Sequence, residues 1–169
     1  MNTYLQRARS AIDDAAGRLD VETLARKIDA RWSIAEILEH LTLAFTANAA
    51  SLEKAVASGE VRPRTPTLKQ TIGRIVVVDV GYFPRVQAPS MTIPNGTIPT
   101  GRALTAIREA IDSLDATLGR VGEKFGMDVM VSNHPYFGGL TVRQWQKLHW
   151  HHTRHHMKQV YQRVRSSRA

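Results

Sequence analysis

The sequence predicts an all-α protein, a four-helix bundle with long crossover connections and short extra helices. Several stretches repeat apolar residues with the helical period, most clearly over 101–125 and 141–165. Two long connections, 84–100 and 127–140, precede these stretches and contain five of the seven prolines. Because the chain has 169 residues and no internal repeat, we expect a single domain over 1–169.

Three further helices follow from apolar spacing and from capping residues. Residues 2–19 place apolar side chains on one face, and Asp20 is the expected N-cap of a short helix that follows. Residues 68–83 contain a β-branched run typical of a buried strand, but their spacing also fits a helix. No second strand is evident to pair with this run, so a helix is favoured. Gly126 is expected to end the helix over 101–125.

A long helix is predicted from Ser33 to about Ala57, and it carries a histidine that points at least partly inward. Ser33 and Glu36 have the spacing of a capping box, in which each side chain accepts a hydrogen bond from the other residue's backbone N–H. His40 lies at the edge of the apolar arc of this helix, whereas Glu39 lies on the other side. A buried imidazole needs a polar partner, and for a lone histidine that partner is more often a hydrogen bond than a metal.

Five of the seven histidines lie on the last helix, predicted over 141–165. A turn of 100° per residue places three of them on the stripe that should face a core, and two on the polar side or its flank. The inward three are His149, His152 and His156, and the outward two are His151 and His155. Imidazoles at i and i+4 on a buried face can hold one divalent metal. The histidine pattern of the last helix therefore predicts a metal site, with a further ligand supplied by another part of the chain.

The motifs on these two helices resemble those of a known family. Residues 32–41, WSIAEILEHL, resemble the second-helix signature of the DinB-like, YfiT-related superfamily of metal-binding four-helix bundles. Residues 152–159, HTRHHMKQ, resemble its last-helix signature H-x-x-H-H-x-x-Q, and residues 134–145 resemble a branch of unknown function. The likeness covers essentially the whole chain in element order, although Met157-Lys158 stands where many relatives carry Arg-Gly. It implies that the metal ligands are His40, His152 and His156.

Composition narrows the classes of partner and ligand. The chain has no cysteine, so any metal must be held by histidine or carboxylate side chains. The net charge of +8 would suit a nucleic acid, but the basic residues are spread and lack an aromatic platform, so that partner is not expected. We find neither an 18-residue apolar run nor the apolar core of a secretory signal, which favours a cytoplasmic protein without a membrane span. The sequence neither predicts nor excludes assembly into a homodimer.

Three neutral imidazoles leave coordination positions free, which is typical of a reactive metal rather than a closed structural one. Zn, Ni, Fe and other divalent ions all suit imidazole, so the ion is not identified. Some members of the superfamily are thiol-dependent, and the resemblance therefore implies a metal-dependent transferase or hydrolase acting on a small molecule, with a low-molecular-weight thiol as a candidate cosubstrate. The alternative is a metal-binding stress or binding protein without catalysis.

His149 is the expected catalytic residue, because it lies one turn before His152 on the same stripe and can carry a proton. A fourth metal ligand or a hydrogen-bonded wall residue are its other interpretations. Gln159 and Glu36 are candidates to orient a ligand imidazole. The two long connections are expected to line the mouth of the site, with Trp145 and Tyr136 as walls. His134 is expected in a turn, or else facing that mouth.

Overall fold

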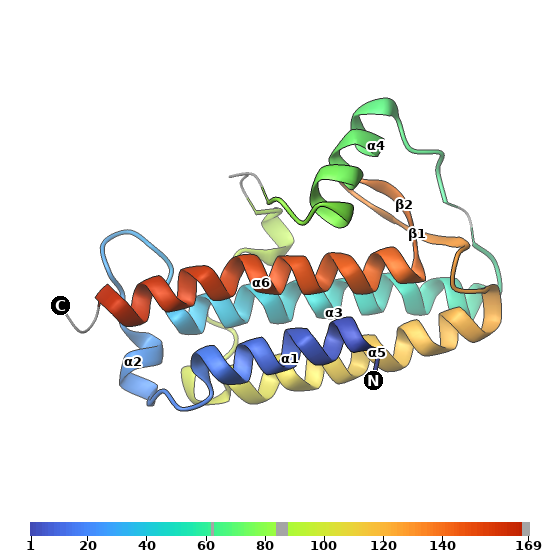
Figure 1. The fold of residues 1–169 in the computed structure, drawn as a ribbon. Coiled ribbons are helices and arrows are strands. Elements are labelled where there is room, and N and C mark those ends of the chain that lie inside the picture. Colours follow the sequence, from blue (N-terminus) through green and yellow to red (C-terminus); the bar gives the residue numbers. More distant parts are fainter. Residues whose placement is uncertain (62, 84–87, 167–169) are drawn as a thin grey trace.

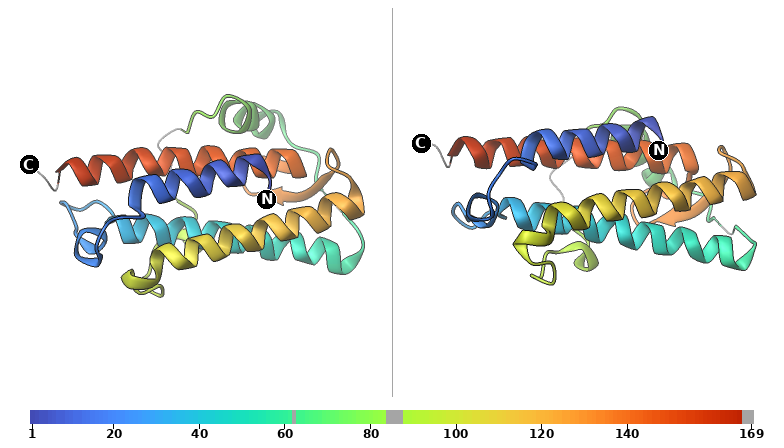
Figure 2. Two further views of the ribbon diagram at one scale, coloured as in Figure 1. Left: turned by 60° about the horizontal axis from the view of Figure 1, so that its bottom comes forward. Right: turned by 90° about the horizontal axis from the view of Figure 1, so that it is seen from below.

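The computed structural model describes residues 1–61, 63–83 and 88–166, and four long helices lie side by side in it (Figures 1 and 2). They are α1 (Thr3–Ala16), α3 (Ile34–Ser58), α5 (Ala103–Phe125) and α6 (Val142–Ser166). Helix α1 packs mainly on α6, and α3 packs mainly on α5. The prediction of an all-α four-helix bundle is confirmed.

The order of the helices requires one long crossover. In Figure 1, α3 and α5 run in the same direction, and α1 and α6 run in the opposite one. Because α3 and α5 are parallel, the chain between them must return along the length of the bundle before α5 begins. It does so outside the bundle, across α6. Helix α6 therefore faces α3 as an antiparallel neighbour and is covered on another side by the crossover.

The crossover and the N-terminal connection contain the short helices. Helix α2 is Val21–Ala25, and α4 is Leu68–Arg74. A π-helix, η1 (Ile75–Asp79), continues α4, so the favoured helix over 68–83 is confirmed for 68–79. Buried Val77 and Val78 attach this segment to the core, which explains the strand-like composition. The 3₁₀ turns η2 (Ser90–Thr92) and η3 (Thr100–Arg102) complete the crossover.

The connection over 127–140 was expected to be irregular, and this expectation was wrong. It forms an antiparallel hairpin of β1 (Met130–His134) and β2 (Gly138–Thr141). Gly138 has φ of 68°, and a Cβ there would lie 3.0 Å from the Cβ of Pro66. Neither strand alternates apolar and polar residues, so the sequence carries no strand period that could have indicated the hairpin.

The predicted caps are present at the helix ends. Ser33 and Glu36 form the capping box of α3, and the Asp20 side chain accepts a hydrogen bond from Thr23 N at the start of α2. Gly126 follows the last residue of α5 with φ of 96°. A second capping box, Thr67 with Gln70, begins α4. The N-terminal caps determine the residue at which each of these helices begins, and so determine the position of its side chains along the bundle axis.

All four long helices contribute to one hydrophobic core. Its largest fully buried side chains are those of Leu5, Ile12, Ile37, Leu38, Leu41, Phe45, Leu52, Ile107, Ile111, Leu114 and Trp145, among others. Within the described ranges, no helix combines the length and apolar character needed to cross a membrane.

Removing the cap of α3 should cost more stability than removing the cap of α4. Ser33→Ala deletes the acceptor for the Glu36 N–H, and we expect a loss of about 1 kcal/mol in the free energy of unfolding, measured by urea denaturation. Thr67→Ala is the matched control, because it deletes the same bond from a peripheral helix without fully buried residues. Equal losses in the two variants would contradict the central role of α3.

Candidate metal centre

Three histidines from α3 and α6 meet at one point. His40 lies in the second turn of α3, and His152 and His156 lie one turn apart on α6. The Nε2 atom of His152 is 3.1 Å from the Nε2 atom of His40 and also 3.1 Å from that of His156. One ring nitrogen from each residue lies within 4.8 Å of the others. The geometry therefore brings together the three histidines that the sequence analysis selected.

The second nitrogen of two of these rings is held by an oxygen acceptor. Thr92 O lies 2.7 Å from His40 Nδ1, and a carbonyl oxygen can only accept, so this Nδ1 carries the proton. Gln159 Oε1 lies 2.9 Å from His156 Nδ1 and orients that ring in the same way. Both rings consequently turn an unprotonated Nε2 towards His152. Such partners on the far nitrogen are typical of metal-ligating histidines.

Burial keeps the three rings neutral. Burial, with a smaller effect of nearby His40, lowers the pKa of His156 to about 3. Burial also lowers the pKa of His152 well below its ordinary value, with His156 and His40 as additional causes. For His40, burial lowers the pKa more than the hydrogen bond to Thr92 raises it. At neutral pH, therefore, none of the three rings carries a second proton.

This donor set fits a divalent cation. His152 Nε2 can donate a proton to only one of its two neighbours, so at least one buried Nε2 lone pair, 3.1 Å away, is left without a donor. A buried lone pair without a donor is unfavourable in a low-dielectric interior, and a cation bound to it removes this cost. Within the described ranges the group includes no fourth histidine and no aspartate or glutamate. A bound ion would keep at least one coordination position for another ligand.

Two aromatic rings flank the three histidines. The Trp32 ring lies 5.2 Å from the His40 ring, and Phe83 stacks on His152 at 5.4 Å between centroids with planes 15° apart. His40 and His156 are buried, whereas His152 is only half-buried. Solvent therefore comes closest to the group at His152.

His149 lies beside the group but not in it. It is 1% exposed, and its Nε2 lies 3.2 Å from Asn48 Nδ2 while its Nδ1 has no partner. Its ring packs on Phe45 at 4.1 Å and along Trp145. Burial, with a smaller effect of His134, lowers its pKa to about 3. His149 is thus a neutral imidazole at pH 7, and its catalytic role stays a prediction.

The expectation that His151 lies on an open polar face was wrong. Its side chain is buried beneath the part of the crossover that follows η1, and among the described residues neither ring nitrogen has a hydrogen-bond partner. Gly81, with φ of +77°, passes so close that a Cβ there would lie 2.5 Å from His151 Nδ1. The Arg154 guanidinium donates to the Gly81 carbonyl oxygen and fixes this approach. His155 remains half-buried on the flank, as predicted, and contacts Phe83.

Glu39 was expected on the side of α3 away from the core, yet it is buried. The crossover covers it, and backbone N–H groups over 95–98 donate to its carboxylate. Neither this residue nor Thr92 was singled out by the sequence analysis. The histidine-to-Thr92 bond involves a backbone carbonyl, which every residue type supplies, so no sequence signal exists for it.

The remaining candidates divide between local roles and the site. Gln159 contacts His156, as the sequence analysis suggested. Glu36 caps α3 and pairs with Lys27 at 2.9 Å. His134 is the last residue of β1, directly before the hairpin turn, and stacks on Phe137. Trp145 belongs to the core. These contacts support the structural interpretation of Glu36, His134 and Trp145.

Only one of the two long connections reaches the three-histidine group. The crossover supplies Thr92, although residues 84–87 of the expected mouth lie outside the described residues. The hairpin instead packs on the last part of α3, where Ser51 Oγ and Ser132 Oγ lie 2.8 Å apart. Its half-exposed Tyr136 therefore lies away from His40, and the expectation that 127–140 lines the mouth was wrong.

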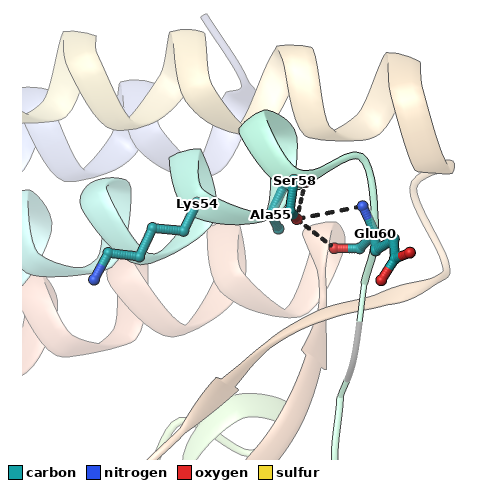
Figure 3. A pocket seen from close by; sticks show the side chains of 4 residues that line it. All are labelled: Lys54, Ala55, Ser58 and Glu60. Atoms are coloured by element: carbon teal, nitrogen blue, oxygen red, sulfur yellow. Dashed lines mark hydrogen bonds between the residues drawn. The ribbon is translucent and has the colours of Figure 1, made fainter.

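A surface hollow of about 480 Å³ lies at the C-terminal end of α3, far along the helix from His40. Figure 3 shows its lining residues Lys54, Ala55, Ser58 and Glu60, with Ser58 Oγ hydrogen-bonded to its neighbours. These bonds are local to the helix end, and among the described residues the only group of potential metal ligands is His40, His152 and His156. The hollow is separate from this group.

Comparison with known proteins agrees with the geometry of the site. The family model described as the DinB superfamily matches residues 4–160, which include α1, the three histidines and most of α6. No curated protein and no solved structure matches the chain significantly.

The buried neutral histidines should make the metal-free protein sensitive to acid. Between pH 6.5 and about 3 the unfolded chain binds a proton at His149 that the folded protein does not bind, so stability falls as pH falls through this range. His149→Phe removes this group, and the slope of unfolding free energy against pH should decrease by about 1.4 kcal/mol per pH unit. Urea denaturation at several pH values, with a chelator present, measures it. An unchanged slope would show that His149 is not the group responsible.

Proposed function

Because this chain belongs to the DinB superfamily and carries three converging histidines, we propose that it binds one divalent metal ion through His40, His152 and His156 and uses it as an enzyme on a small molecule. The observation that carries the proposal is the arrangement of the Nε2 atoms, with Nδ1 of two rings held by Thr92 and Gln159. The proposed reaction type is a thiol-dependent transfer or a hydrolysis.

The free coordination position supports the enzyme proposal. A divalent ion in this position supplies Lewis acidity to a water molecule or a thiol. The protein's own residues supply the surroundings: Trp32 and Phe83 exclude water from His40 and His152, and Gln159 keeps the His156 ring oriented. Since the chain contains no cysteine, a thiol would have to come from solution as a cosubstrate.

His149 is the proposed catalytic residue. It lies one turn before His152, and at neutral pH it is unprotonated and able to accept a proton. The contact between Asn48 and His149 Nε2 leaves Nδ1 as the nitrogen without a partner. Because the Asn48 amide nitrogen can only donate, the lone pair of the neutral His149 ring is on Nε2 and its proton is on Nδ1. On this proposal, Nε2 of His149 receives the proton of the reacting molecule in place of the hydrogen bond from Asn48.

The metal should stabilise the folded protein. A ligand that binds only the folded state adds about 2.7 kcal/mol at a hundredfold excess over its dissociation constant. Thermal melting of metal-loaded protein with and without a chelator should therefore differ, and the difference should vanish in His152→Ala. His155→Ala is the matched control, since its ring lies outside the three-histidine group and the difference should persist. A melting curve of the loaded wild type that a chelator leaves unchanged would overturn the metal proposal.

A thiol should reach the bound metal. In the cobalt-loaded protein, titration with a low-molecular-weight thiol should produce a thiolate-to-cobalt charge-transfer band that saturates, because a coordination position is open. The alcohol of the same shape is the control and should give no such band. If cobalt binds to the three histidines but no thiol changes its spectrum, the thiol-dependent reaction is wrong and hydrolysis or simple metal binding remains.

Substitution should separate metal binding from catalysis. His149→Ala should retain the metal and lose turnover, whereas His156→Ala should lose both, because only the second removes a ligand. Metal content is measured by elemental analysis, and turnover with a panel of small electrophiles and esters with and without added thiol. Metal-loaded wild-type protein that turns over no member of the panel would favour the non-catalytic metal-binding protein.

A further inference from the structure

The carboxylate of Glu39 binds residues 95–98 of the crossover to α3. Figure 2 shows the path of this part of the crossover as the yellow-green segment before α5. Backbone N–H groups of four successive residues point at it, and so does one hydroxyl group. The donors are Asn95 N at 3.4 Å, Gly96 N at 3.2 Å, Thr97 N at 2.9 Å, Thr97 Oγ1 at 3.1 Å and Ile98 N at 3.4 Å.

This arrangement is unusual for a glutamate in a helix. The side chain is only 3% exposed, and within the described ranges no lysine or arginine forms an ion pair with it. Burying a carboxylate is costly unless hydrogen bonds replace its hydration. Here the loop supplies them, and Gly96 contributes the positive φ of +77° that turns its neighbours' N–H groups towards one acceptor.

The same loop supplies the acceptor for a proposed metal ligand. Thr92 precedes the Glu39-bound segment by a few residues, and its carbonyl oxygen lies 2.7 Å from His40 Nδ1. Thr92 is itself buried, and its hydroxyl donates to Pro89 O at 3.0 Å. The loop is thus joined to α3 at two adjacent residues of the helix, Glu39 and His40. These two attachments are coupled because one short segment carries both.

We infer that Glu39 is a positioning residue for the metal centre: by holding the loop over 95–98 it places the Thr92 carbonyl so that His40 keeps its proton on Nδ1 and directs Nε2 towards His152. This inference rests on the proposed function for its effect on metal affinity. Without the Glu39 clamp, the loop loses five hydrogen bonds and Thr92 is free to move from His40. The His40 ring then loses the acceptor that selects its tautomer.

The primary test compares Glu39→Gln with Glu53→Gln. Glutamine places an NH₂ group against loop N–H donors, so it cannot replace the carboxylate. Glu53 lies on the same helix and bonds Thr117 and Arg120 of α5, so its substitution weakens packing away from the site. Cobalt affinity, measured by competition with a chromophoric chelator, should fall about 10- to 100-fold in Glu39→Gln, the range found when a ligand's orienting partner is lost. Its visible spectrum should also change. Glu53→Gln should match the wild type in both.

A second readout requires no metal. Nitrogen-15 NMR of the histidine rings in the metal-free protein should show His40 with the proton on Nδ1 in the wild type and in Glu53→Gln. In Glu39→Gln the signal should change to a mixture of the two tautomers. If the wild type binds no metal, the proposed function fails, and this measurement still decides whether Glu39 positions His40.

A variant on the loop guards against loss of folding. Gly96→Val places a β-branched residue at positive φ on an exposed segment, with no heavy atom within 4 Å of the added Cβ, so it disturbs the loop without touching the core. It should reproduce both changes if Glu39→Gln does not fold. A folded Glu39→Gln or Gly96→Val protein with wild-type His40 tautomer and wild-type cobalt affinity would overturn the inference.

Discussion

The meeting of three neutral imidazoles between α3 and α6 is the constraint on which the rest of the structure depends. Two of the three Nε2 atoms are unprotonated because Thr92 O and Gln159 Oε1 hold the protons on Nδ1. Burial opposes further protonation, so on the proposed function it is a metal cation, and not a second proton, that these Nε2 lone pairs bind. A fold that forms such a cluster must orient these two rings through a hydrogen bond to the other nitrogen of each, Nδ1. The crossover loop does this for His40, and α6 does it for His156.

The cluster also requires that α3 and α6 have a fixed position relative to each other along the bundle axis. His152 and His156 are one turn apart automatically, but His40 meets them only if α3 begins at the right place. The Ser33 cap sets that start, and the buried Arg163 side chain donates from Nε to Trp32 O at 2.9 Å, directly before it. Further along, Asn48 and His149 connect the same two helices. The site is thus bracketed by hydrogen bonds between its two helices.

The sequence was sufficient to predict those features of the site that depend on a single helix. Helical spacing placed His152 and His156 inward, and Gln159 follows His156 by one turn, so its contact was within reach of the same argument. The burial of His151 and Glu39 could not be predicted in this way. Helical spacing separates the apolar face of a helix from its polar face, but it does not say which part of the polar face another segment covers. In both cases the crossover covers the residue, through Gly81 and through 95–98. The hairpin was missed for a related reason, since its pairing depends on backbone groups.

The charge of the site gives a reason to expect an anionic ligand at the free position. A divalent ion held by three neutral imidazoles keeps its full charge, and within the described ranges no carboxylate belongs to the group. The closest carboxylate in sequence, Glu39, is occupied by loop N–H donors. A net charge of +8 over the chain provides no general compensation either. In a partly buried site with a low effective dielectric, an uncompensated cation favours hydroxide, thiolate or an anionic substrate group over a neutral ligand. On the proposed function, the arrangement of Glu39 would therefore have two consequences: it would orient His40, and it would leave the charge of the ion to be balanced by the molecule that binds there.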